Sequence, residues 1–476
     1  MTDPTICIHG HFYQPPREDP LTGIIPIEMG AVPFNNWNEK IHSECYRPNA
    51  ELRNFSRVSF NIGPTLLNWL ASYDPDTLEK IIDQDHENYA KYGVGNALAQ
   101  PFNHTILPLA SYRDKVTQVR WGITDFEFRF GRKPQGMWLP ETAIDTETLL
   151  VLSDAGIEFT ILAPWQAHAN RLDPTEPYIV SLPGKRQIIA FFYHGELSSK
   201  ISFEPGATLN ADHFVTNEVV PHLNPIKKKS GEPQLMLLAS DGELYGHHKP
   251  QRQLFLKHLV NGASSGLNIQ ITFPALWLKH HPPRRKIQLR YQTSWSCHHG
   301  IRRWETGCPC TPGDSSWKGH MRQALNKLAA ALDNLYYEQV SRIVPEPWEL
   351  RNRYIDVLLG KTSLAQLLSE FSPNSHSFDT IQRMHWLLES QFERQRMFTS
   401  CGWFFEDFDR IEPRNNIAYA AQAVWMAYQA TGLDLTAKAS EWLKIISSRS
   451  GDIRADQVFL KHLLRAQTSR QNMPIH

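Results

Sequence analysis

The chain has 476 residues, more than a single hydrophobic core usually holds, so we expect two domains or one barrel with a large additional part. Its 49 basic and 49 acidic side chains balance, which argues against a nucleic acid or an anionic membrane as a partner. The N-terminus has no charged segment followed by an apolar one, and no apolar run approaches the roughly 20 residues of a membrane span, so we expect a cytoplasmic protein.

Up to about residue 285, short apolar runs alternate with amphipathic stretches. The apolar runs predict β-strands at Ile6–His9, Val58–Ile62, Gly136–Leu139, Phe159–Leu162, Ile188–Phe192, Leu235–Leu238 and Leu267–Thr272. The amphipathic stretches predict helices, among them Pro64–Leu70, Thr146–Ala155 and Pro250–Leu259. Alternation of strand and helix predicts a parallel sheet, and the number of units favours a barrel over an open sheet.

After the segment Lys279–Arg285, in which consecutive prolines interrupt regular structure, the apolar spacing becomes helical. Apolar residues three and four apart predict a first helix and are Met321, Leu325, Leu328, Leu332 and Leu335. Further helices are expected at Leu350–Leu359, Ser363–Phe371, Ile381–Met397, Ile417–Ala430 and Thr436–Ser447. We therefore expect an α/β barrel domain over residues 1–285, followed by an all-α domain over residues 286–476 that packs on it.

Two carboxylates follow predicted strands directly. Glu141 comes after the run 136–139, and Asp241 comes after the run 235–238. In α/β barrels the catalytic side chains collect at the carboxyl ends of the strands. Two acids at one barrel mouth can cleave a glycosidic bond, one attacking the sugar while the other protonates the leaving oxygen. Taken singly, Glu141 could equally belong to the first turn of a helix beginning near Asp145, and Asp241 could be a turn residue.

Polar and aromatic residues that suit a sugar site accompany these acids. His9 and His11 are two residues apart at a strand end and therefore share a face, where they could bind sugar hydroxyls or, with a carboxylate, a metal. His104 adds an imidazole in another loop, and Trp138 offers a flat apolar ring. Sugar sites combine such polar groups with an aromatic face.

The cysteines do not form a disulfide framework, because there are only six in so long a chain. Cys297, with His298 and His299 directly after it, lies close to Cys308 and Cys310. Cys308 and Cys310 flank a single proline, whereas structural zinc sites usually place two to four residues between paired ligands. We therefore expect a tight loop without a metal.

These motifs resemble glycoside hydrolase family 57, a family of α-glucan-active enzymes with an incomplete (β/α)7 barrel. Trp138 and Glu141 match the family's Trp-x-x-Glu nucleophile motif, and Asp241 and Glu243 match its Asp-Gly-Glu-like acid/base segment. The family's opening His-rich strand ending in Gln-Pro is matched, with two residues inserted, by His9, His11, Gln14 and Pro15. The matches occur in the family's order within residues 1 to about 285.

The resemblance implies a retaining mechanism without a cofactor, in which Glu141 forms a glycosyl-enzyme and Asp241 is the acid/base. It implies an α-glucan or a maltooligosaccharide as the substrate. The residues expected to bind that substrate are His9, His11, Gln14, His104, Trp138, Glu243, Trp295 and Trp403.

Several functions remain open. The glycosyl-enzyme can pass to water or to a second glucan, so an α-amylase-like hydrolase, a 4-α-glucanotransferase and a branching enzyme are all consistent with these residues. A metal-dependent polysaccharide deacetylase would need a metal bound by His9 or His11 with Asp241, and the Asp-Asp pair expected on an early strand is absent. A non-catalytic glucan-binding protein would not need both acids.

The helical half contains aromatic-rich segments around Trp295 and in the run Gly402-Trp403-Phe404-Phe405. One hypothesis is that such a loop closes the glucan cleft. The alternative is that these aromatics pack between the barrel and the helices, because large aromatic side chains dominate such interfaces.

Overall fold

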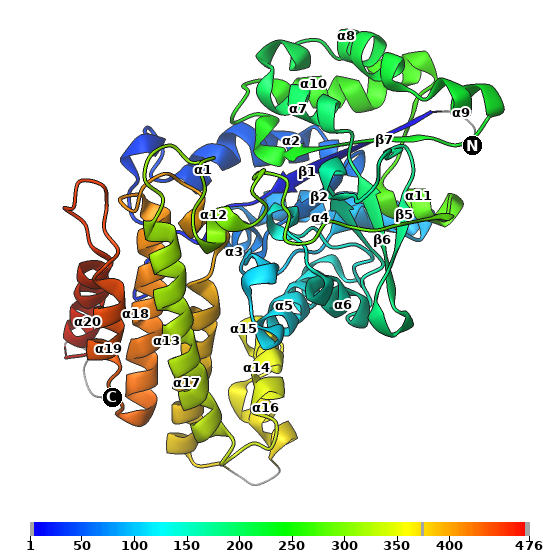
Figure 1. Cartoon of the computed structure of the whole chain (residues 1–476). Coiled ribbons are helices and arrows are strands. Elements are labelled where there is room, and N and C mark those ends of the chain that lie inside the picture. The colour runs from blue at the N-terminus through cyan, green and yellow to red at the C-terminus, as the bar shows by residue number, and fades with distance from the viewer. Residues whose placement is uncertain (1–3, 373–375, 472–476) are drawn as a thin grey trace. The chain divides into compact units, whose positions relative to one another are not determined.

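The computed structural model describes residues 4–372 and 376–471 (Figure 1). The chain divides into two units, each assembled from separate stretches of sequence. The first unit comprises Met1–Gln14, Ile27–Phe102 and Phe126–Trp295, and the second comprises Pro15–Pro26, Asn103–Asp125 and Ser296–His476. Among the described residues, no helix is both long and apolar enough to cross a membrane.

The first unit is built on parallel strands. The strands are β1 (Thr5–Phe12), β2 (Ser59–Ile62), β3 (Ala97–Leu98), β4 (Phe159–Leu162), β5 (Tyr178–Ser181), β6 (Gln187–Phe192), β7 (Leu235–Asp241), β8 (Gln270–Ile271) and β9 (Arg285–Ile287). One sheet has the order β3-β2-β1-β7, with β8 also pairing with β1, and the other has the order β4-β6-β5-β9. The pairs β1–β2, β1–β7, β2–β3 and β4–β6 are all parallel.

Residues 136–138 join the two sheets. Met137 forms a parallel bridge to Ala99, just after β3, and Gly136 forms one to Phe159 of β4. On the other side, the His194 N–H that follows β6 donates to the carbonyl of Leu237 in β7, 2.7 Å away. Seven parallel segments thus follow one another around an incomplete (β/α)7 barrel, which confirms the expected fold.

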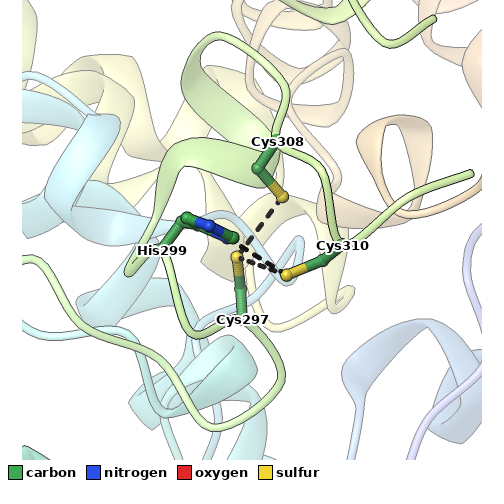
Figure 2. Close-up of side chains that lie close together, drawn as sticks. All are labelled: Cys297, His299, Cys308 and Cys310. Atoms are coloured by element: carbon green, nitrogen blue, oxygen red, sulfur yellow. Dashed lines mark hydrogen bonds between the residues drawn. The ribbon is translucent and has the colours of Figure 1, made fainter. Parts of the chain in front are cut away.

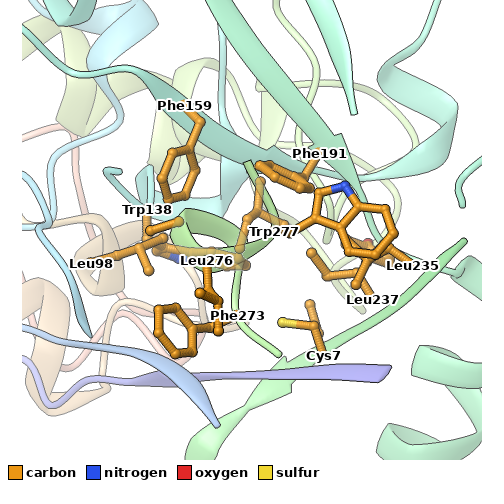
Figure 3. Packing of buried hydrophobic residues seen from close by; sticks show 14 of the residues in the cluster. Cys7, Leu98, Trp138, Phe159, Phe191, Leu235, Leu237, Phe273, Leu276 and Trp277 are labelled. Atoms are coloured by element: carbon orange, nitrogen blue, oxygen red, sulfur yellow. The ribbon is translucent and has the colours of Figure 1, made fainter. Parts of the chain in front are cut away.

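Alternation along the strands places an apolar core below a polar layer. On β1, Cys7, His9 and His11 share one face, and on β7 Leu237 and Asp241 share one face. Cys7 and Leu237 belong to the buried apolar cluster drawn in Figure 3, together with aromatic residues of β4 and β6. The same faces become polar toward the carboxyl ends of the strands, so the barrel presents polar side chains where barrel active sites lie.

Helices of 4 to 18 residues connect the strands of this unit. They are α1 (Trp37–Ile41), α2 (Arg47–Glu51), α3 (Pro64–Tyr73), α4 (Pro75–Tyr92), α6 (Thr146–Asp154), α7 (Gly195–Phe203), α8 (Ala211–Phe214), α9 (Pro225–Ser230), α10 (Arg252–His258) and α11 (Pro274–His280). Local sequence explains their ends. Asp74 caps α4 by accepting the Thr77 N–H, and Gly93 ends the helix in the left-handed conformation that glycine adopts without strain.

The second unit is helical. Its helices after residue 296 are α12 (Arg302–Glu305), α13 (Trp317–Val340), α14 (Pro347–Arg353), α15 (Ile355–Leu358), α16 (Leu364–Phe371), α17 (Phe378–Arg396), α18 (Ile411–Thr431), α19 (Thr436–Leu443) and α20 (Ala455–Gln471). The long helices α13, α17 and α18 run side by side (Figure 1). Helix α5 (Tyr112–Phe130) begins in this unit and ends in the first.

Buried ion pairs and a hydrogen bond attach the two early segments to these helices. Asp114 lies 2.8 Å from Arg394 and 3.2 Å from Arg351, and all three side chains are almost completely buried. The Tyr419 hydroxyl donates to the Pro16 carbonyl 3.0 Å away. A single boundary at residue 285 does not describe this arrangement, because tertiary contacts assign residues 15–26 and 103–125 to the helical unit.

Most predicted elements are present with shifted ends. The structure adds the short strands β3, β5 and β9, which the sequence did not indicate. The run 136–139 pairs only through isolated bridges, and the helix expected over 350–359 divides into α14 and α15 at Tyr354. Such short or interrupted elements depend on tertiary pairing, which periodicity alone does not reveal.

Candidate active site

A chain of polar side chains lies at the carboxyl ends of β1 and β2. The register pairs His9 with Ser59 and His11 with Asn61. His9 Nδ1 is 2.9 Å from Ser59 Oγ, and Asn61 Oδ1 lies 3.3 Å from His9 Nε2 and 3.2 Å from His11 Nδ1. The Asn61 amide donates in turn to Gln100 Oε1, 2.6 Å away. These bonds fix the orientation of both imidazoles.

The two histidines are neutral at physiological pH. Burial lowers the pKa of His9 to about 3, with a smaller contribution from the nearby His11, and burial lowers the pKa of His11 to about 4. His11 Nδ1 lies 3.0 Å from Asn61 Nδ2 and 3.2 Å from Asn61 Oδ1, so the tautomer of His11 sets which of these two atoms it pairs with. A neutral imidazole suits hydrogen bonding to a hydroxyl group.

Trp138 supports these imidazoles. Its ring stacks on His9 at 4.7 Å and on His11 at 5.2 Å, and it is 0% exposed. Trp295 meets it edge-on at 5.0 Å. A wholly buried indole has no open face for a sugar, so this placement gives Trp138 a packing role beneath the histidines, which differs from the expected sugar platform.

Glu141 has a left-handed backbone conformation and accepts two hydrogen bonds from Trp295. Its φ of 57° and ψ of 19° lie in the left-handed region, where a residue with a side chain is strained and which is enriched at functional sites. The Trp295 N–H donates to the Glu141 carbonyl at 2.9 Å, and the indole Nε1–H donates to Glu141 Oε2 at 3.1 Å. Helix α6 is capped by Asp145, so Glu141 is not needed in its first turn.

Asp241 ends β7 opposite His11 of β1. Its side chain retains solvent access, and it makes no capping hydrogen bond to the short 3-10 helix that follows at Gly242–Leu244. The protein atoms around it reduce its hydration and, with a smaller contribution from the Glu141 carboxylate, raise the pKa of Asp241 to about 7. The two acids are therefore close enough to interact, and one of them holds its proton near neutral pH.

Glu243 lies near Asp241 and belongs to a hydrogen-bonded group. Its Oε1 accepts from the Tyr46 hydroxyl at 2.7 Å and from the Tyr13 N–H at 3.0 Å, and Gln14 Nε2 donates to the Tyr46 oxygen at 3.1 Å. Burial, followed by the charge of Asp241, raises the pKa of Glu243 to about 8. Gln14 and Glu243 thus share one hydrogen-bonded group through Tyr46.

The Trp295 indole N–H donates to Glu141, so we expect Trp295→Phe to lower kcat by about 10- to 100-fold, because one hydrogen bond to a charged group contributes roughly 1.5 to 3 kcal/mol. KM should change less, since the bond joins the enzyme to its own carboxylate. Steady-state kinetics on a maltooligosaccharide would measure the separation of kcat from KM. An unchanged kcat with a raised KM would instead assign Trp295 to sugar binding alone.

His104 and Trp403 belong to the second unit, not to the unit that contains Glu141 and Asp241. His104 Nδ1 is 2.6 Å from Ser400 Oγ. Trp403 is 0% exposed, its indole N–H donates to the Lys318 carbonyl at 3.1 Å, and Arg322 lies 3.9 Å from its ring centre. This placement favours the packing alternative for Trp403.

Sequence reasoning missed Ser59, Asn61 and Tyr46. A signal was available for the first two, because they are polar residues two positions apart in a predicted apolar strand, the same pattern that singled out His9 and His11. Tyr46 offered no such signal, because it contacts Glu243 only through the tertiary fold.

The spacing of Cys308 and Cys310 in the sequence argued against a metal site. In the second unit, however, the structure brings four possible metal ligands together. The side chains of Cys297, His299, Cys308 and Cys310 converge, with their possible ligand atoms all within 4.8 Å of one another (Figure 2). Within residues 4–372 and 376–471, no other group of three or more such side chains is arranged to hold one ion, at His9 and Asp241 or elsewhere.

Comparison with known families divides the chain in two. The model of glycosyl hydrolase family 57 matches residues 25–290. A second model, described as a domain of unknown function (DUF3536), matches residues 314–476.

Individual relatives are distant. An α-amylase of Pyrococcus horikoshii is 23% identical over 53% of this chain and 38% of its own length, and a 4-α-glucanotransferase of Thermococcus litoralis is 26% identical over 53% and 37%. The chain thus matches less than half the length of these curated relatives.

Among solved structures, an exo-type maltose-forming amylase of Pyrococcus sp. ST04 aligns with a TM-score of 0.76 at 15% identity, covering 97% of this chain and 89% of that one. A branching enzyme of Pyrococcus horikoshii aligns with a TM-score of 0.60 at 14% identity, covering 93% and 95%. These alignments support the fold.

Proposed function

Because the chain belongs to glycosyl hydrolase family 57, we propose that it cleaves α-glucans with retention of configuration, using Glu141 and Asp241. The observation that carries this proposal is the pairing of the two carboxyls at the barrel mouth. Glu141 is held by Trp295, while the pKa of Asp241 is raised to about 7. A proton donor beside an anchored carboxylate is the arrangement that a retaining glycosidase needs.

The proposed reaction has two steps. Glu141 attacks the anomeric carbon as the bond to the leaving oxygen breaks, and Asp241 transfers its proton to that oxygen. Asp241, now ionised, then removes a proton from water or a sugar hydroxyl, whose oxygen attacks the same carbon and releases Glu141. This mechanism requires the two carboxyl groups to lie about 5 to 5.5 Å apart. His9 and His11 supply neutral hydrogen-bonding groups for the sugar.

We expect kcat/KM to fall as the pH rises above about 7, because Asp241 must be protonated in the first step and its pKa is about 7. Removing the Glu141 charge should lower the pKa of Asp241, since that charge is one of the two causes of its increase. A pH–rate profile and an NMR titration of Asp241 in Glu141→Gln would test both statements. A flat rate profile from pH 5 to about 9 would contradict the assignment.

Product analysis tests the proposed reaction. The protein is incubated with single maltooligosaccharides and with amylose, with Glu141→Gln as the inactive control. Shorter products alone indicate hydrolysis. Products longer than the donor indicate transfer, and new α-1,6 linkages indicate branching. No turnover of any glucan by the wild-type protein would overturn the proposal.

Transfer is a second candidate because a 4-α-glucanotransferase is among the relatives at 26% identity. The chemistry up to the glycosyl-enzyme is the same, and the acceptor decides the product. The deacetylase alternative is disfavoured by geometry, because the imidazoles of His9 and His11 are engaged with Ser59 and Asn61 and form no ligand group with Asp241 among the described residues.

A further inference from the structure

Four possible metal ligands of the second unit lie in a segment that neither family model matches. Residues 291–313 fall between the two matched ranges, 25–290 and 314–476. Within this segment, the Cys297 Sγ lies 3.5 Å from the Cys308 Sγ and 3.9 Å from the Cys310 Sγ. His299 Nδ1 lies 3.2 Å from the Cys310 Sγ. Figure 2 shows the four side chains pointing toward one another.

These distances fit a shared ion. In a tetrahedral site with Zn–S bonds of about 2.3 Å and Zn–N bonds of about 2.05 Å, two sulfurs are about 3.8 Å apart, and a sulfur and a nitrogen are about 3.6 Å apart. A disulfide would need a separation of about 2.05 Å. The thiols are therefore too far apart to be bonded covalently, and their spacing is close to that of ligands around one zinc ion.

The backbone presents the ligands from two similar turns. In the first, the Gly300 N–H donates to the Cys297 carbonyl at 3.1 Å, and in the second the Thr311 N–H donates to the Cys308 carbonyl at 3.2 Å. Each turn has a possible ligand at its first and third positions, which are residues 297 and 299 in one and 308 and 310 in the other. The backbone N–H of each third residue also hydrogen-bonds the sulfur of the first. Such bonds stabilise a thiolate.

Nearby cations complement the charge that such a site would have. A zinc ion with three thiolates and a neutral imidazole has a net charge of −1. The Lys318 side chain is 0% exposed, and its ammonium group donates to Thr311 Oγ1 at 3.2 Å. Cys308, Cys297 and, more weakly, the Glu406 carboxylate are close enough to interact with this ammonium group electrostatically. Arg303 interacts in the same way with Cys308.

We propose that Cys297, His299, Cys308 and Cys310 bind one structural Zn²⁺. Binding converts three thiols to thiolates with the release of three protons, while His299 contributes the lone pair of Nδ1. Soft thiolates with an imidazole in tetrahedral arrangement select zinc over harder cations. Four protein ligands leave no position for a substrate or a water molecule, so the ion cross-links the two turns and takes no part in glucan chemistry.

Metal analysis of the full-length protein tests this proposal directly. After purification from zinc-supplemented cells under reducing conditions and extensive dialysis, elemental analysis should find about one zinc per chain. Replacing the zinc with cobalt should give the intense visible absorption of tetrahedral Co²⁺ together with sulfur-to-cobalt charge-transfer bands. A strong chelator should lower the Tm of the wild-type protein by roughly 5 °C or more, because binding free energy of the metal contributes to folding.

Adjacent histidines provide a matched control. His298 and His299 are both exposed, but only His299 belongs to the ligand group. His299→Ala should lower zinc retention at least tenfold after chelator challenge, whereas His298→Ala should retain zinc as the wild type does. Cys308→Ser with Cys310→Ser should abolish binding and the chelator-dependent shift in Tm. Cys401→Ser, outside the group, should preserve both.

Three results would overturn the proposal. These are wild-type protein that takes up less than about a tenth of a zinc per chain, stoichiometric iron in place of zinc, and a Cys297–Cys308 disulfide in the metal-free protein under reducing conditions. The wild-type measurements decide the matter even where a variant fails to fold.

Discussion

Glu141→Gln and Asp241→Asn should each lower kcat by about 10³-fold or more, which corresponds to at least about 4 kcal/mol of activation free energy. The first change removes the attacking carboxylate, and the second removes the proton donor. Steady-state kinetic assays on a maltooligosaccharide would measure the decrease in kcat. Azide should restore part of the rate of Glu141→Ala, because it can replace the missing nucleophile.

Stability measurements separate loss of chemistry from loss of folding. The folded-state pKa of Asp241, about 7, lies above its ordinary value, so its ionisation costs folding free energy once the pH rises above the ordinary value. Asp241→Asn removes that cost. The variant should therefore be at least as stable as the wild type at acidic pH and more stable above about pH 7. Near-normal turnover by either folded variant would remove that residue from the proposed mechanism.

Trp403→Ala should reduce the free energy of unfolding of the helical unit by about 3 to 5 kcal/mol. The indole is wholly buried, donates a hydrogen bond to the Lys318 carbonyl and packs against Arg322. Its removal leaves a cavity in the interior and removes the hydrogen bond that the indole N–H donates. Urea denaturation of the full chain, followed by fluorescence and circular dichroism, would measure the change.

Two further variants serve as controls for the Trp403→Ala measurement. Phe378→Ala removes a large aromatic side chain that is 78% exposed in the same unit, and should change stability by no more than about 0.5 kcal/mol. Trp403→Phe keeps most of the volume and loses the N–H, so its effect should be intermediate. Unchanged stability of Trp403→Ala combined with weaker oligosaccharide binding would restore the hypothesis that Trp403 lines the glucan cleft.

The sequence by itself determined most of the longer strands and helices, the α/β barrel class and the two acids at strand ends. It could do so because the period of an apolar pattern is a local property, and because Glu141 and Asp241 directly follow buried runs. The family resemblance added the catalytic roles, which stay proposals for these two residues.

Only the tertiary structure decided which side chains are hydrogen-bonded or ion-paired with one another. Asn61 between His9 and His11, and Trp295 on Glu141, join residues far apart in the chain. The assignment of residues 15–26 and 103–125 to the helical unit likewise depends on buried pairs such as Asp114 with Arg394. The four ligands of the proposed zinc site escaped a rule based on residue spacing, because each turn places one residue, rather than two to four, between its two ligands. Contacts of this kind arise when loops close, and loop closure leaves no periodic pattern in the sequence from which it could be predicted.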